Sequence, residues 1–254
     1  MSNIDPVHLK IGIVGIGVMG SGIAQSLSLA GVSSVVCVDV TDDALERART
    51  TIERGRYGIN SAVERGLVTG EVAQRAIASI AYSTDRSSIH DSDVVIEAVF
   101  EDLALKIRLF RELDRDVDGR AVLASNTSGF PICALAAATD RPGQVVGWHW
   151  ASPAPVQRMA EIVRTPETNP ATVELVKSLA ERCGKNPVVI NDTMMDWGFV
   201  ANRVFGAARR EAQRVVSEGI TDEAGVDQLM KDCFRWPAGP FELTGGARSN
   251  WSER

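Results

Sequence analysis

A histidine and a glutamate in the middle of this chain are of the residue types that could handle the proton of an alcohol. The chain has only three histidines, and His8, in the leader, and His90, in a polar loop, are expected at the surface. His149 ends an apolar segment, and Glu161 follows 12 residues later. A neutral imidazole can accept a hydroxyl proton, and a carboxylate beside it fixes its tautomer and stabilises the imidazolium. With a nicotinamide cofactor to take a hydride, these groups are suited to alcohol–ketone interconversion.

A glycine-rich signature near the start of the chain predicts where such a cofactor binds. The sequence Gly15-Ile16-Gly17-Val18-Met19-Gly20 follows an apolar strand predicted over 10–15 and opens a helix predicted over 18–30. The first glycine permits a tight turn, the second lets the backbone approach a pyrophosphate, and the third permits close packing of helix on strand. The helix N-terminus adds N–H donors and a positive dipole. The predicted cofactor-binding residues here are Gly15, Gly17, Val18, Met19 and Gly20.

Asp39 indicates which nicotinamide cofactor is preferred. It ends the next predicted strand, 35–40, and lies 19 residues after Gly20, near the spacing at which a carboxylate binds the ribose hydroxyls. A carboxylate there would repel a 2′-phosphate, and no arginine follows it closely, so NAD is expected rather than NADP. The simpler alternative is an ordinary tight turn with an aspartate at a strand end.

The order of predicted elements indicates an α/β fold with two domains. Strands predicted over 94–99, 121–125, 145–150, 159–163 and 187–191 alternate with helical stretches, which is typical of a parallel sheet. After about residue 192 the pattern becomes helical, with helices predicted over 198–219 and 224–234. We therefore expect a Rossmann-type, mostly parallel sheet domain over 1–191. A small all-α domain over 192–254 is expected to pack on the first domain or on a second subunit.

Composition limits the classes of partner. Lys and Arg number 27 against 33 Asp and Glu, a net charge of −6, which argues against binding to nucleic acid or an anionic membrane. No apolar run approaches the roughly 18 residues needed to span a bilayer, and the N-terminal segment lacks the apolar core of a secretory signal. The four cysteines are far apart and form no CxxC pair. They are expected to be reduced thiols of a cytoplasmic protein without a metal site.

A polar tetrapeptide, Ser125-Asn126-Thr127-Ser128, ends one of the predicted buried strands. Such a cluster is most often only a turn. Its place at the carboxyl end of a parallel strand, however, is where α/β sheets bind ligands.

Taken together, the motifs resemble the 3-hydroxyacyl-CoA dehydrogenase family, of the 3-hydroxybutyryl-CoA dehydrogenase type, over about residues 9–243. The pattern His-x-x-x-Pro at His149, with Glu161 beyond it, is the most specific part. The opening also looks like the 6-phosphogluconate and 3-hydroxyisobutyrate dehydrogenase group, but that group uses a lysine base. The resemblance implies an NAD-dependent homodimeric oxidoreductase of fatty acid metabolism that interconverts 3-hydroxyacyl-CoA and 3-ketoacyl-CoA thioesters.

The resemblance also implies roles for the catalytic residues. His149 would be the general base and Glu161 its orienting carboxylate. Ser125 would contact the substrate oxygen and the cofactor. Asn202, in the segment GFVANRV, would hold the substrate carbonyl near the histidine.

Three further residues fall at positions where the family contacts the cofactor. Glu97 and Lys106 do so within the segment 94–110. On residue type alone, a strand-end carboxylate facing water and a solvated helix lysine would be the simpler interpretation of these two. Ser152 is the third, and it stands where family members usually have Asn.

The chain also departs from the family, which leaves the substrate open. Gly129 replaces a second serine, Gly58 stands about where a CoA-contacting serine is expected, and the hinge 191–199 is longer and adds Met194, Met195 and Trp197. The sequence ends at Arg254, soon after Gly-Pro-Phe-Glu, whereas members continue for several more turns. One alternative is therefore a dehydrogenase of the same family for a non-CoA hydroxy acid or a cyclic or aromatic alcohol. Trp148, Trp150 and Trp197 would then line its pocket, or could equally be core. Another is a non-catalytic, NAD-binding structural protein.

Overall fold

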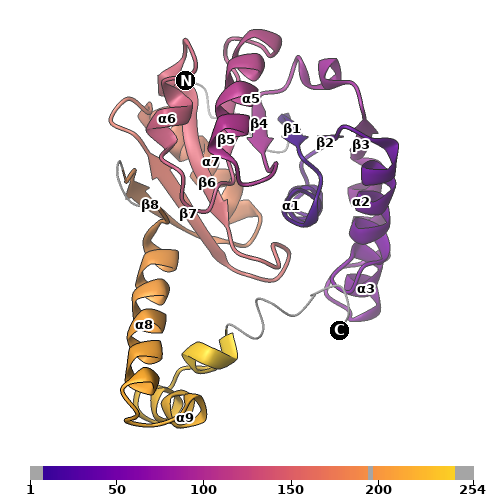
Figure 1. Ribbon diagram of the computed structural model, residues 1–254. Helices are drawn as coiled ribbons and strands as arrows, with labels where there is room; N and C mark the ends of the chain where they lie inside the picture. The colour runs from indigo at the N-terminus through magenta and orange to yellow at the C-terminus, as the bar shows by residue number, and fades with distance from the viewer. Residues whose placement is uncertain (1–7, 194–196, 244–254) are drawn as a thin grey trace. The chain divides into compact units, whose positions relative to one another are not determined.

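The computed structural model describes residues 8–193 and 197–243, and the chain divides into two compact units, Met1–Asp196 and Trp197–Arg254. The first unit holds all the strands of the described chain, and the second is helical (Figure 1). Each unit is described by itself below.

The first unit is built on an eight-stranded sheet in the order β3-β2-β1-β4-β5-β6-β7-β8. The first six strands of this order are parallel, β7 is antiparallel to β6, and β8 is parallel to β7. The order 3-2-1-4-5-6 is that of a dinucleotide-binding doubly wound sheet, which confirms the predicted fold class. The strands are β1 (Lys10–Val14), β2 (Ser34–Val38), β3 (Ile80–Ser83), β4 (Val94–Glu97), β5 (Val122–Ser125), β6 (Val145–Trp150), β7 (Met159–Arg164) and β8 (Asn186–Asn191).

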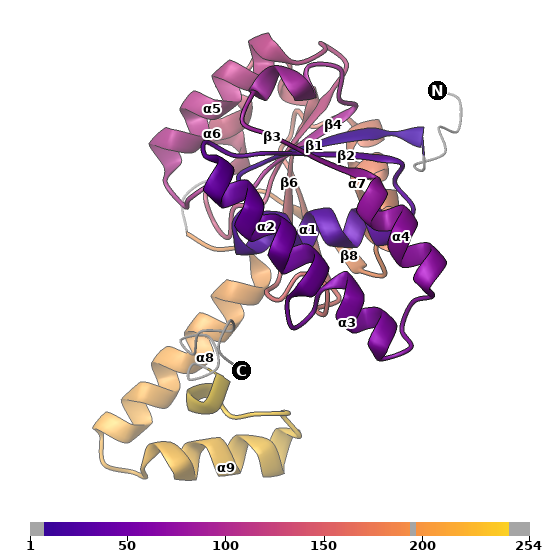
Figure 2. The same ribbon diagram turned by 90° about the vertical axis from the view of Figure 1, so that its right-hand side faces the viewer.

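Helices cover both faces of this sheet. Helices α1, α2, α4 and α7 lie on one face and α5 and α6 on the other (Figure 2). Their bounds are α1 (Val18–Leu29), α2 (Asp42–Arg54), α3 (Ile59–Glu64), α4 (Gly70–Ala78), α5 (Leu103–Asp116), α6 (Ile132–Ala136) and α7 (Pro170–Arg182), with short 3-10 helices at Arg86–Ile89 and Pro142–Gln144.

Two separate helices, α2 and α3, follow β2. Gly55 and Gly58 both adopt extended backbone, with ψ of 166° and 168°, and this breaks the helical path between α2 and α3. Thr69 caps the N-terminus of α4, since its hydroxyl accepts a hydrogen bond from the Val72 N–H at 3.3 Å. Strand β3 is not among the strands that the sequence predicts.

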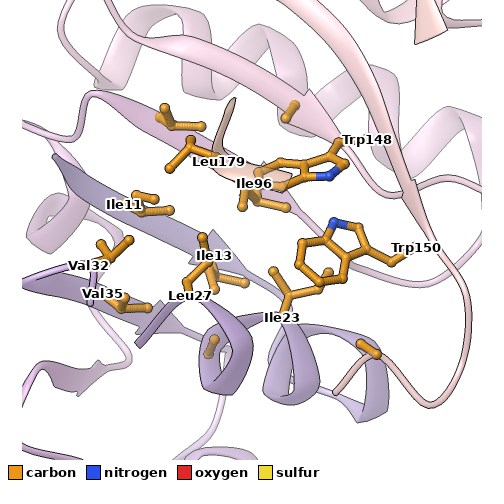
Figure 3. Close-up of a cluster of buried hydrophobic side chains, with 14 of the residues drawn as sticks. Ile11, Ile13, Ile23, Leu27, Val32, Val35, Ile96, Trp148, Trp150 and Leu179 are labelled. Carbon is orange, nitrogen blue, oxygen red and sulfur yellow. The ribbon is translucent and has the colours of Figure 1, made fainter. Parts of the chain in front are cut away.

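Two tryptophans fill the core beneath α1 and α7. Trp148 and Trp150 are 0% and 2% exposed, and their ring centroids lie 5.1 Å apart. They pack with Ile23 of α1 and Leu179 of α7 (Figure 3). Of the two alternatives for these tryptophans, the core is therefore correct and the pocket lining is wrong.

The second unit contains the two predicted helices, α8 (Val200–Ser217) and α9 (Glu223–Phe234). Asp227 of α9 is buried, and its carboxylate accepts the N–H groups of Phe241 and Glu242, both at 2.9 Å. The Gly-Pro-Phe-Glu segment is thus folded back onto α9. In both described ranges together, no helix combines the length and apolarity needed to cross a bilayer.

Candidate functional site

The glycine-rich turn joins β1 to α1, and two of its glycines are required by the fold. Gly15 has φ of +88°, and a Cβ on it would lie 2.8 Å from the backbone of Ala98. A Cβ on Gly20 would lie 2.0 Å from the Gly15 carbonyl oxygen. Gly17 differs, because its φ of −67° suits any residue and a Cβ would meet nothing within 4 Å. No described protein atom explains this glycine, which fits close approach of a bound pyrophosphate to the N-terminus of α1.

Asp39, directly after β2, lies against the same turn. Its Oδ2 accepts the Ile16 N–H at 2.8 Å and its Oδ1 accepts the Val40 N–H at 2.7 Å. The carboxylate is therefore fixed beside the glycines, where a ribose could reach it. Of the predicted neighbours in the turn, Val18 is 76% exposed and Met19 partly buried.

The polar side chains of three further candidates share one face of the sheet. In β4, β5 and β6 the residues Ile96, Ala124 and Trp148 point into the core under α1 and α7. Because side chains alternate along a strand, Glu97, Ser125 and His149 lie on the opposite face, the one covered by α5 and α6. All three are at the carboxyl ends of parallel strands, where sheets of this kind bind ligands.

A buried network joins Glu97, Ser125 and Lys106. Glu97 and Ser125 are register partners on β4 and β5, and Lys106 comes from α5. The Glu97 carboxylate accepts from Lys106 Nζ at 2.5 Å, from the Ser125 hydroxyl at 2.6 Å and from the Val99 N–H at 2.8 Å. Glu97 is 0% and Lys106 1% exposed. The simpler interpretation, a carboxylate facing water and a solvated lysine, is therefore wrong, and contact of these two residues with the cofactor stays a prediction.

Glu101 is a member of this network that the sequence analysis missed. Its Oε2 lies 3.2 Å from Lys106 Nζ, and its Oε1 accepts from the Thr127 hydroxyl at 2.6 Å and the Ser128 N–H at 2.7 Å. The side chain of Glu101 is 34% exposed, unlike that of Glu97. A second carboxylate four residues after Glu97, just before the Asp102 cap of α5, was the available signal.

His149 and Glu161 face each other on neighbouring strands. They are register partners in the antiparallel pair β6·β7, and His149 Nδ1 lies 2.7 Å from Glu161 Oε2. The two strands thus lie side by side in the sheet. Both side chains are buried, at 6% and 4% exposure. A carboxylate only accepts hydrogen bonds, so Nδ1 carries the hydrogen and the lone pair of the neutral imidazole is on Nε2.

The structure places the other predicted residues as follows. Ser152 is exposed in the loop between β6 and β7. Asn202 lies in the first turn of α8, in the second unit, and is half-buried. Trp197 is 59% exposed in that unit, while Met194 and Met195 lie outside the described residues.

Gly58 is the N-cap of α3, and a Cβ there would lie 2.8 Å from the Gly55 nitrogen. The local turn thus accounts for a glycine where the family has serine.

Comparison with known proteins agrees with this geometry. Residues 10–193 match the NAD binding domain of 3-hydroxyacyl-CoA dehydrogenase, and residues 198–248 match the C-terminal domain of the same family. A probable 3-hydroxybutyryl-CoA dehydrogenase of Deinococcus radiodurans is 35% identical over 235 residues, which cover 92% of this chain and 82% of that protein.

Two solved structures show the same architecture. The (S)-3-hydroxybutyryl-CoA dehydrogenase of Ralstonia eutropha is 32% identical, with a TM-score of 0.88, over 94% of this chain and 82% of that one. An NAD+-dependent 5-formyl-3-hydroxy-2-methylpyridine 4-carboxylic acid 5-dehydrogenase is 31% identical, with a TM-score of 0.77, over 94% of this chain and 76% of that one.

The open glycine turn, the fixed aspartate beside it and the two matched domains lead to one conclusion. This chain belongs to the 3-hydroxyacyl-CoA dehydrogenase family, as an NAD-dependent oxidoreductase acting on CH–OH groups.

Proposed function

We propose that this chain interconverts 3-hydroxyacyl-CoA and 3-ketoacyl-CoA thioesters, with His149 as the general base. The observation that supports this most is the buried contact of 2.7 Å between His149 Nδ1 and Glu161 Oε2. It leaves Nε2 as the nitrogen that takes the proton of the substrate hydroxyl. Bound NAD supplies the acceptor for the hydride that leaves the same carbon. In the opposite direction the imidazolium returns its proton to the carbonyl oxygen.

Glu161 keeps the imidazole in the right tautomer and stabilises its charged form once the proton has moved. Because both side chains are held by paired strands, little reorganisation is needed during the reaction. Ser125 and Asn202 are proposed to bind the substrate oxygen, Ser125 from the end of β5 and Asn202 from the start of α8. Ser125 is also proposed to contact the cofactor.

The cofactor contacts are proposed to be the glycine turn, Asp39, Glu97, Lys106 and Ser152. Gly15, Gly17, Val18, Met19 and Gly20 would receive the pyrophosphate at the N-terminus of α1. Asp39 would bind the adenosine ribose. Glu97 and Lys106 are buried in their own ion pair. They would therefore act on the nicotinamide side mainly through Ser125, which donates to Glu97.

The test is NADH oxidation with acetoacetyl-CoA by the wild-type chain and by His149→Gln. The variant is expected to lower turnover by about 10²- to 10⁴-fold with little change in the affinity for NADH. His90→Gln is the matched control. His90 is exposed, and its Nδ1 contacts the carbonyl oxygen of Asp116, which is not among the proposed site residues. Near-normal turnover by His149→Gln would overturn the base assignment.

A second candidate is the same reaction on a non-CoA hydroxy acid or a cyclic or aromatic alcohol. It is favoured by the likeness to the pyridine carboxylic acid dehydrogenase and by Gly58 at the expected CoA-contacting position. The same assay with free 3-hydroxy acids and hydroxymethylpyridines, with NAD, distinguishes the two candidates. Turnover of those compounds alone would keep the mechanism and replace the substrate. NADH binding without any turnover would support a non-catalytic role.

We also propose that the chain is a cytoplasmic homodimer of fatty acid metabolism, with a substrate- and dimer-forming domain over 192–254. Exposed apolar side chains in the second unit support an interface there. Val204, Leu229 and Phe234 are 67%, 63% and 64% exposed. The four cysteines are free thiols, as in proteins of reducing compartments. Sedimentation velocity of the wild-type chain tests the dimer, and a single monomeric species would exclude it.

A further inference from the structure

Lys185 is a buried lysine that the proposed mechanism does not use. It follows Gly184 in the turn between α7 and β8 and is only 6% exposed. Burial lowers the pKa of its amine, because desolvation disfavours the charged form. In the two ranges that the structure describes, no carboxylate forms an ion pair with it. Burying an ammonium group without a carboxylate partner lowers the stability of the fold. The contacts that Lys185 makes instead therefore need an explanation.

The ammonium group of Lys185 binds the loop that follows His149. Its Nζ donates to the carbonyl oxygens of Ala154 at 2.5 Å and of Gln157 at 2.8 Å. It also lies 4.9 Å from the centroid of the Trp150 ring, in cation–π geometry. Lys185 therefore connects the α7–β8 turn to the 151–158 loop and to the end of β6.

The opposite side of the same loop lies against α1. A Cβ on Gly22 would come within 2.9 Å of the Ala154 Cβ and 3.0 Å of Pro155 Cδ. Gly22 lies two residues after the last glycine of the signature, on the helix whose N-terminus is proposed to meet the cofactor. The loop is thus held between Lys185 and α1, and Ser152 lies at its start.

We propose that Lys185 is a positioning residue that clamps the 151–158 loop against α1 and so fixes Ser152 at the cofactor. This inference rests on the proposed function, in which Ser152 contacts the cofactor. His149 does not depend on the clamp to the same degree, because the β6·β7 pairing and Glu161 hold it. Loss of the clamp should therefore weaken cofactor binding more than it slows the chemical step.

The test compares Lys185→Met with Lys177→Met. Lys177 is partly exposed on α7, and its ammonium group lies 3.6 Å from the carboxylate of Glu174, one turn earlier, an interaction of little energetic consequence. For Lys185→Met, the KM for NADH is expected to rise about tenfold, with kcat within about threefold of wild type. Methionine is close to lysine in length and removes a buried charge, so the melting temperature should not fall. Lys177→Met should change none of these values.

Hydrogen exchange gives a readout that does not need turnover. The N–H groups of Val156 and Gln157 both donate to the Pro153 carbonyl oxygen at 3.0 Å inside the clamped loop. Their exchange should accelerate in Lys185→Met and stay unchanged in Lys177→Met. Unchanged exchange together with an unchanged KM for NADH would overturn the proposal.

A second variant tests the proposal even if Lys185→Met does not fold. Gly22→Ala pushes on the loop from the α1 side, so it should reproduce the higher KM for NADH and the faster exchange at Val156 and Gln157. If it does neither, the clamp has no role in cofactor binding. If the wild-type chain binds NADH but turns over no substrate, the proposed function fails. Direct titration of NADH into the same variants then still decides the role of Lys185.

Discussion

At the scale of single residues, the same residue type serves different purposes at neighbouring positions. The three glycines of the β1–α1 turn illustrate this, because Gly15 and Gly20 are required by sterics and Gly17 is not. Among the carboxylates, Glu97 is fully buried and accepts from three donors, whereas about a third of the Glu101 side chain is exposed to solvent. Sequence motifs located the three glycines and Glu97 but not Glu101, and only the packing around each residue distinguishes its role.

The glycine distinction predicts opposite effects of two alanine substitutions. Gly17→Ala places a methyl group in open space at the cofactor side, so the KM for NAD should rise about tenfold while the melting temperature stays within about 2 °C. Gly20→Ala forces a methyl group against the Gly15 carbonyl oxygen. Overpacking of this kind costs about 1–3 kcal/mol, and each kcal/mol lowers the melting temperature by about 2–4 °C in a chain of this size.

Thermal melts and NAD kinetics on the two variants check this prediction. A large loss of thermal stability in Gly17→Ala, without any change in KM, would show that Gly17 also serves the fold. The conclusion that its open space receives the cofactor would then be wrong.

At the scale of elements, strands and helices could be predicted from patterns along the chain. Contacts between side chains of different elements could not. Apolar runs predict seven of the eight strands, and those from β1 to β6 among them do so because buried parallel strands are nearly continuous in apolar residues. Strand β3 was missed because it is a short edge strand in which Ala81 is exposed and Tyr82 and Ser83 are partly exposed. The burial of Glu97 and Lys106 could not be read from local sequence, since it depends on α5 packing over β4 and β5.

The buried Glu97–Lys106 pair predicts a strong stability effect. Lys106→Met leaves the Glu97 carboxylate buried without its cation, which should lower the free energy of unfolding by about 3–5 kcal/mol. Adding Glu97→Gln should restore much of this loss, because the amide oxygen can still accept from the Val99 N–H and the amide NH2 can donate to the Ser125 hydroxyl oxygen, while the charge is gone. Urea unfolding of the wild-type chain, both single variants and the double variant measures the coupling. Additive losses would mean that the two side chains do not interact across β4 and α5.

At the scale of the whole molecule, the chain divides into two units, and the roles that depend on contacts of the second unit could not be predicted from the sequence. The helical pattern after residue 192 predicted α8 and α9. The roles proposed for Asn202 and for the exposed apolar side chains depend on how a second surface meets this unit, which no local pattern encodes. The four cysteines are distributed over both units, so each unit carries its own thiol probe. Cys37, Cys133 and Cys183 are in the first, and the exposed Cys233 is in the second.

This distribution allows thiol labelling to follow each unit separately. Burial raises the pKa of the Cys37 thiol to about 12. At pH 8 the buried native thiol is therefore almost entirely protonated and not in the reactive thiolate form, so labelling requires unfolding, which returns the thiol to its ordinary pKa. Cys233 should react at once. NADH at about 100 times its Kd should stabilise the sheet unit by about 2.7 kcal/mol and slow Cys37 labelling about 100-fold.

Mass spectrometry of the four cysteine peptides, with and without NADH, checks this outcome. Cys233 labelling should not change, because the dinucleotide site is proposed to lie in the first unit. Equal slowing at Cys37 and Cys233 would show that the cofactor orders both units together. An unchanged Cys37 rate would exclude NADH binding to the sheet unit, since a ligand that binds only the folded state must reduce the unfolded fraction.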